Sequence, residues 1–160
     1  MSRIGKAPIS VPEGVEVNIA QGNVVTVKGK LGELTQKMNP EMTLKMEDGT
    51  LTVERPSESK EHKSQHGLVR SLLNNMIIGV SEGYTIVQEL VGVGYKASAN
   101  GQVLELALGY SHSIFLELPD EVKVETLTER GKNPTITLKS HDKQLVGQVA
   151  AKIRSFRKPE

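Results

Sequence analysis

The sequence predicts an α+β protein of two tandem, duplicated domains, each a mostly antiparallel sheet packed against one main helix. The first observation behind this prediction is a repeated strand, because TLTV at 50–53 and TITL at 135–138 are nearly the same four residues. The second is a repeated helix: HKSQHGLV at 62–69 shares three positions with DKQLVGQV at 142–149. Matches that recur at one period indicate duplication of an α+β unit.

The first domain is predicted to span residues 1–81. Short segments with alternating apolar residues indicate its strands, at 15–20, 23–29, 32–38, 42–48 and 50–54. Asp48-Gly49 joins the last two as a hairpin. A helix follows over 60–78, because its apolar residues recur at helical spacing: Leu68, Val69, Leu72, Leu73, Met76 and Ile77.

The second domain is predicted to span residues 82–160. Its expected strands lie around 84–91, 94–99, 103–108, 114–118, 122–126 and 135–139, with a tight hairpin at Asn100-Gly101. Ser140 is expected to cap the last helix, with Asp142 in the first turn, where the helix dipole favours an anion. The apolar stripe of this helix comprises Leu145, Val146, Val149, Ala150, Ile153 and Phe156.

Composition narrows the class of protein. The chain has no cysteine, which excludes disulfides, thiolate metal sites and cysteine nucleophiles. The N-terminal MSRIGKAPIS has no apolar run of the kind found in signal peptides. No stretch approaches the roughly 18 apolar residues that a membrane span needs. These features predict a soluble, cytoplasmic protein.

Charge is distributed unevenly along the second domain. Residues 81–138 carry four Lys and Arg against eight Asp and Glu, a net charge of −4, whereas residues 139–160 carry six against two, a net charge of +4. A basic terminus on an acidic body is typical of chains that contact phosphate. A merely solvated basic terminus is the alternative.

Three motifs suggest chemistry, and geometry argues against each. GVGYKA at 92–97 fits a dinucleotide fingerprint, but that motif must open a helix, and here a hairpin follows. Its glycines Gly92 and Gly94 are expected to permit a bulge or a close backbone approach in a strand. Ser140-His141-Asp142 cannot form a triad, because consecutive side chains diverge. His62 and His66 lack a third metal ligand and are expected to be solvated. We therefore predict no enzyme, no metal and no cofactor.

Binding remains, and the five aromatic residues are too few and too scattered for a base-stacking platform. Contact with phosphates, riboses and the shape of folded nucleic acid is favoured instead. Lys143, Gly147, Arg154 and Lys158 fall on one side of the last helix, away from its apolar stripe. A glycine in the middle of a helix lowers the stability of the helix by up to about 1 kcal/mol relative to alanine. Close approach of an RNA backbone or of another protein segment would explain why a glycine occurs at position 147.

Five segments of the chain resemble the bacterial ribosomal protein L6 family of the large subunit, in the same order: MSRIGKAPISVP at 1–12, VKGKLGEL at 27–34, GVGYKA at 92–97, LGYSHS at 108–113 and SHDKQLVGQVAAKIRSFRKPE at 140–160. The resemblance implies two domains of one duplicated fold and a non-enzymatic role. It also implies binding to 23S rRNA, mainly through the C-terminal domain, near the base of the stalk where translation factors dock. Neighbouring large-subunit proteins would be further partners, with no membrane and no small-molecule substrate. Ser113 departs from the family, which usually has proline there.

Carried over by position, the resemblance implies an RNA-binding surface made of two loops and the last helix. Its residues are Gly92, Gly94, Tyr95, Lys96, Tyr110, Ser111, His112, Ser113, Ser140, Lys143, Gln144, Gly147, Arg154, Arg157 and Lys158. A core role is the alternative for Tyr95 and Tyr110. The alternative function for the whole chain is a protein-interaction module without direct RNA contact.

Overall fold

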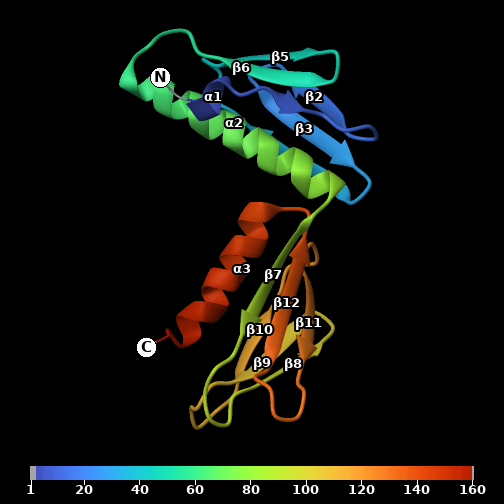
Figure 1. The fold of residues 1–160 in the computed structure, drawn as a ribbon, viewed down its shortest axis with the longest axis vertical. Helices are drawn as coiled ribbons and strands as arrows, with labels where there is room; N and C mark the ends of the chain where they lie inside the picture. The colour runs from blue at the N-terminus through green and yellow to red at the C-terminus, as the bar shows by residue number, and fades with distance from the viewer. Residues whose placement is uncertain (1–2, 160) are drawn as a thin grey trace. The chain divides into compact units, whose positions relative to one another are not determined.

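The structure is a computed structural model that describes residues 3–159. The chain divides into two compact units, Met1–Glu82 and Gly83–Glu160. Each unit contains two three-stranded antiparallel sheets and one long helix (Figure 1). The predicted α+β class is therefore confirmed. Within the described residues no helix is long and apolar enough to cross a membrane.

Unit 1 begins with a one-turn helix and ends with its long helix. Its elements are α1 (Arg3–Lys6), β1 (Ile9–Ser10), β2 (Glu16–Ala20), β3 (Val24–Gly29), β4 (Gly32–Lys37), β5 (Thr43–Glu47), β6 (Thr50–Glu54) and α2 (Lys60–Ser81). The strands form two sheets, in the orders β1-β6-β5 and β2-β3-β4. The predicted strands are all present within two residues of the expected bounds, and the helix continues three residues further.

The core of unit 1 lies between the central strands and α2. Alternation buries Val25 and Val27 on β3 and Leu51 on β6, while the intervening residues face outward. Leu73, Val80 and their neighbours on α2 close the core. Each fully buried Leu or Val stabilises the fold by about 1.5–3 kcal/mol relative to exposure. The hairpin of β3 and β4 meets the end of α2 closely, because Leu31 N–H donates to Val80 O at 3.1 Å.

The expectation of two solvated histidines on α2 is wrong. His66 is 3% exposed, and its Nε2 donates to Val53 O at 2.7 Å, because a carbonyl can only accept. Its ring packs so closely on Gly5 that a Cβ there would lie 2.5 Å from Nδ1. The sequence pattern missed this because the contact comes from the N-terminal turn, about 60 residues away in the chain.

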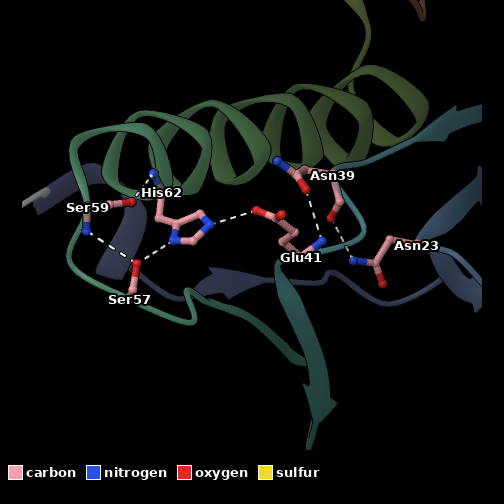
Figure 2. A network of polar contacts seen from close by, with 6 residues as sticks. All are labelled: Asn23, Asn39, Glu41, Ser57, Ser59 and His62. Carbon is pink, nitrogen blue, oxygen red and sulfur yellow. Dashed lines mark hydrogen bonds and ion pairs between the residues drawn. The ribbon is translucent and has the colours of Figure 1, made fainter.

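His62 belongs to a polar chain at the start of α2 (Figure 2). Its Nε2 donates to Glu41 Oε2 at 2.6 Å, and Nδ1 is hydrogen-bonded to the Ser57 hydroxyl. Ser59 caps the helix by accepting from the His62 amide at 3.2 Å. The order Ser57, His62, Glu41 matches that of the catalytic side chains in serine hydrolases, but these hydrogen bonds are exposed to solvent. The Ser57 hydroxyl also accepts from the Ser59 amide at 3.3 Å, so the network fixes the loop before α2.

Unit 2 repeats this arrangement. Its elements are β7 (Tyr84–Glu89), β8 (Lys96–Asn100), β9 (Val103–Ala107), β10 (Ile114–Glu117), β11 (Lys123–Leu127), β12 (Thr135–Ser140) and α3 (Lys143–Phe156). The sheets have the orders β11-β12-β7 and β10-β9-β8. In Figure 1, α3 lies beside β7 and β12. Leu104, Leu106, Ile136 and Leu138 are fully buried, with Val146 of α3 packed in the same core.

The two repeated words occupy equivalent places in the two units. TLTV lies in β6 and TITL in β12, and each strand is the central one of a three-stranded sheet. Both strands bury alternate residues, and each precedes the long helix of its unit. The duplication predicted from the sequence is thus present in the fold.

Candidate nucleic-acid interface

The C-terminal end of α3 forms one wall of a groove in unit 2. The groove has a volume of about 660 Å³. The loop that follows β7 forms the opposite wall. The residues that line the groove are Gln88, Glu89, Leu90, Val91, Gly92, Tyr95, Leu108, Ile153, Arg154, Arg157, Lys158 and Pro159. Five residues of the predicted RNA-binding surface therefore lie around one cavity, and three of the five are cations.

The loop between β7 and β8 owes its shape to two glycines. The Tyr95 ring lies so close to Gly92 that a Cβ at Gly92 would be 2.6 Å from it. Gly94 has a φ of +77°, a conformation that side chains rarely adopt. Val93, between them, is fully exposed. The predicted bulge within a strand is wrong, because β7 ends at Glu89 and residues 90–95 form a turn before β8. The predicted close approach is present at Gly92, where the Tyr95 ring packs against the backbone of the turn.

Arg157 fastens the second loop, residues 109–113, to the end of α3. Its Nη1 donates to Leu108 O at 3.1 Å, and its guanidinium carbon lies 5.1 Å from the centre of the Tyr110 ring. The Tyr110 hydroxyl in turn donates to Phe156 O at 2.9 Å. Tyr110 is 47% exposed, so these contacts hold the ring on the surface and not in the core.

Most of the rest of this loop is exposed to solvent. The His112 ring stacks beside Tyr110, with ring centres 6.1 Å apart and planes at 19°. Ser111 is exposed and Ser113 is half-buried. The loop therefore presents two parallel rings and hydroxyl groups next to the guanidinium of Arg157. These are groups that bind RNA backbone and ribose.

The start of α3 differs from the prediction in its cap. Asp142 is the N-cap, and its Oδ1 accepts from the amides of Gln144 and Leu145 at 3.0 and 3.3 Å. Ser140 instead ends β12, paired with Tyr84, and is only 8% exposed. Its hydroxyl accepts from the Asp142 amide at 3.1 Å. The prediction was wrong because the strand continues to Ser140, and this buries the serine.

The outward side of α3 carries a glycine, Gly147, against which no described residue packs. A Cβ built at Gly147 meets nothing within 4 Å. The alternative that another segment of this protein packs on Gly147 is therefore wrong for the described residues. Gln144 is exposed nearby, and the Lys143 ammonium lies 5.4 Å from the centre of the Tyr84 ring. A cation–π contact of this kind leaves the charge at the surface.

The predicted residues thus form two groups and not one. Gly92, Tyr95, Arg154, Arg157 and Lys158 line the groove, and Arg157 links the 109–113 loop to it. Lys143, Gln144 and Gly147 lie toward the other end of a 14-residue helix, about 20 Å long. Lys96 is exposed at the start of β8 and does not line the groove.

Gln88 also lines the groove, although it was not among the residues predicted from the sequence. Its Nε2 donates to Ala150 O at 2.9 Å and so ties β7 to α3. A signal was present in the sequence. Residues 84, 86 and 88 share one face of a strand, and a polar residue on an otherwise apolar face indicates a specific contact.

The fold and this surface define a class of protein: a duplicated α+β protein whose second unit has a basic helix end beside two loops. Within the described residues no group of three or more acidic or histidine side chains could hold a metal. The family model described as ribosomal protein L6 matches residues 11–83 and 91–160. The chain belongs to the ribosomal protein L6 family.

Similar proteins come from several bacteria. Proteins named large ribosomal subunit protein uL6 from Parabacteroides distasonis, Cytophaga hutchinsonii and Flavobacterium psychrophilum are 61%, 58% and 59% identical over 160 residues. The match covers all of this chain and 87%, 87% and 88% of those proteins. Family membership confirms the predictions of a structural, non-enzymatic ribosomal protein and of a place in the cytoplasmic ribosome.

Proposed function

We propose that this chain is a structural constituent of the bacterial large ribosomal subunit that binds 23S rRNA near the stalk base, and that residues 82–160 form the main RNA-binding domain. The names of the similar proteins support a place for this chain in the large ribosomal subunit. The observation that carries the RNA contact is the gathering of Arg154, Arg157 and Lys158 around the 660 Å³ groove beside two ordered loops. Ser140 is omitted from the surface because it is buried.

Arg154 and Lys158 are suited to phosphate. Both side chains are exposed, and neither has an ion pair or hydrogen bond to a described residue. A cation without an internal partner can neutralise a phosphate at no cost to a native contact, and it releases a condensed counterion as it does so. Arg157 has a different role, because its contacts within the chain hold the loop at 109–113 in place.

The loops favour folded RNA over single strands. Single-strand binding depends on several aromatic platforms for successive bases, and this face offers the exposed pair Tyr110 and His112. The turn at 92–94 projects backbone and the small side chain of Val93, which can approach a sugar–phosphate surface closely. Shape and backbone contacts of this kind are the usual means of recognising helical RNA.

The division of labour between the units gives a direct test. Residues 83–160, made as a separate chain, should retain a 23S rRNA fragment, and residues 1–82 should not. The charge of +4 over residues 139–160 and both contact loops lie in the C-terminal unit. Filter binding at several salt concentrations measures both, and circular dichroism checks that each half is folded. Binding by the N-terminal unit alone would refute the assignment.

Gly147→Ala should separate stability from RNA binding. The site has open space, so the extra methyl raises helix stability by about 0.5–1 kcal/mol. The same methyl should weaken affinity for the RNA fragment if a sugar–phosphate backbone lies against this position, and Gly147→Glu should weaken it further. Thermal melting and filter binding give the two readouts. A stabilised variant of unchanged affinity would place the RNA away from Gly147.

A further inference from the structure

A second surface in unit 2, distinct from the RNA face, is centred on β10. This strand lies at the edge of the sheet β10-β9-β8. Leu118 N–H donates to Gln102 O at 2.7 Å, which fixes the alternation of the ladder with β9. In an antiparallel pair, alternate residues direct their backbone groups away from the partner strand. The amides and carbonyls of Phe115 and Glu117 therefore face the open edge.

An apolar groove lies along this strand. It has a volume of about 390 Å³. Leu116, Leu118, Leu145 and Val149 contribute its apolar walls, from the end of β10 and from the flank of α3. The remaining lining residues are Glu117, Pro119, Gln148 and Lys152, and the Lys152 ammonium lies 5.7 Å from the centre of the Phe156 ring. A side chain that pointed inward from an added strand would enter this groove, beside Leu116.

The opposite face of the same strand carries an exposed aromatic ring beside acidic side chains. Phe115 is 66% exposed, and it pairs across the ladder with Glu105, which is also exposed. Glu117, the strand residue after Leu116, is exposed next to Val103 and also borders the groove. Neither carboxylate forms an ion pair with a described residue. The face thus offers an aromatic ring and two unpaired negative charges within the segment 81–138, whose net charge is −4.

We propose that the edge of β10 is a protein-docking site that takes an extended segment in which basic and apolar residues alternate. Such a segment would add a fourth strand by hydrogen bonds to Phe115 and Glu117. Since side chains alternate along a strand, its apolar residues would enter the groove and its basic residues would meet Glu105, Glu117 and the Phe115 ring. The two carboxylates select a basic protein segment and repel nucleic acid. This inference is independent of the proposed RNA interface.

The test uses the full-length chain and synthetic peptides. One peptide alternates Val with Arg or Lys, and a matched peptide of the same composition places all its Val residues in one block. The alternating peptide should bind about tenfold more tightly, because the block peptide cannot satisfy both faces. Its binding should protect the amides of Phe115 and Glu117 from hydrogen exchange. Methylating the backbone nitrogens of one alternate set of peptide residues should abolish binding, while the other set should tolerate it.

Protein variants test the charges. Glu117→Lys and Glu105→Lys should each weaken the alternating peptide by about fivefold to tenfold, and the control Glu13→Lys, in the other unit, should not. Equal binding of both peptides, or no binding of either, would overturn the proposal. Protection of the Phe115 and Glu117 amides by self-association or by an rRNA fragment, in place of the peptide, would overturn it as well. The N-methyl series uses the native chain, so it decides the matter even where a variant fails to fold.

Discussion

Gly29→Ala should lower the free energy of unfolding of unit 1 by about 3 kcal/mol, as the sum of an overpacking cost and a weakened hydrogen bond. A Cβ at Gly29 would lie 2.6 Å from Val80 O and 3.0 Å from the carbonyl carbon of the same residue. Both are backbone atoms of α2, so no rotamer change can relieve the clash. The end of the helix must move away from the β3–β4 hairpin, and this stretches the Leu31 N–H···O bond to Val80.

Denaturation followed by residue-resolved hydrogen exchange measures this effect, because the two units need not unfold together. The expected loss corresponds to a fall in the melting temperature of unit 1 by roughly 15 °C. Gly147→Ala in unit 2 is the matched control, since the same methyl there meets open space. Val80→Ala should not rescue Gly29→Ala. Rescue would show that the side-chain atom Cγ2, 2.9 Å away, carries the clash instead of the backbone.

Periodicity predicted most of the fold because the long helices and most of the strands follow their local pattern, whereas the short elements α1 and β1 carry no such pattern. Strands β3 and β6 of unit 1 alternate more and less buried residues over six and five positions, and this is the signal that local sequence carries. The repeat placed β6 and β12 in equivalent positions before any contact was known. The N-cap of α3 was predicted wrongly for a physical reason. Serine and aspartate are both favoured as N-caps, but Ser140 pairs with Tyr84 in the sheet, and Asp142 therefore caps the helix.

The predicted surface was less complete, because tertiary contacts assemble it. Arg157 donates a hydrogen bond to Leu108, which lies 49 positions earlier in the chain, and no local sequence pattern indicates that contact. Which residues line the groove likewise depends on how α3 packs against β7. The hydrogen bond from Gln88 to Ala150 helps to fix that packing. Residue type nevertheless indicated the cations correctly as surface residues, since Arg and Lys are rarely buried without a partner.

The double substitution Arg154→Glu with Lys158→Glu should lower affinity for a 23S rRNA fragment on the order of a hundredfold near 0.1 M salt. Each phosphate contact contributes a factor of about five to eight at that salt concentration, and the introduced carboxylates add repulsion. The magnitude of the salt slope should fall by roughly 1.5, from two contacts at about 0.7 to 0.9 each. Filter binding over a range of salt concentrations gives both values.

The matched control is Lys123→Glu with Arg130→Glu, which changes the net charge of the same unit by the same amount. Both residues are exposed, on β11 and in the loop after it, and neither lines the groove. If the RNA responded only to net charge, the two double variants would lose affinity equally. A loss confined to Arg154 and Lys158 requires that the phosphates lie at the end of α3, because screening limits the reach of a surface charge to about 10 Å at this salt concentration. Stability should change little in either variant, since surface substitutions usually stay within about 0.5 kcal/mol. An equal loss in both would leave the groove without a specific role in RNA binding.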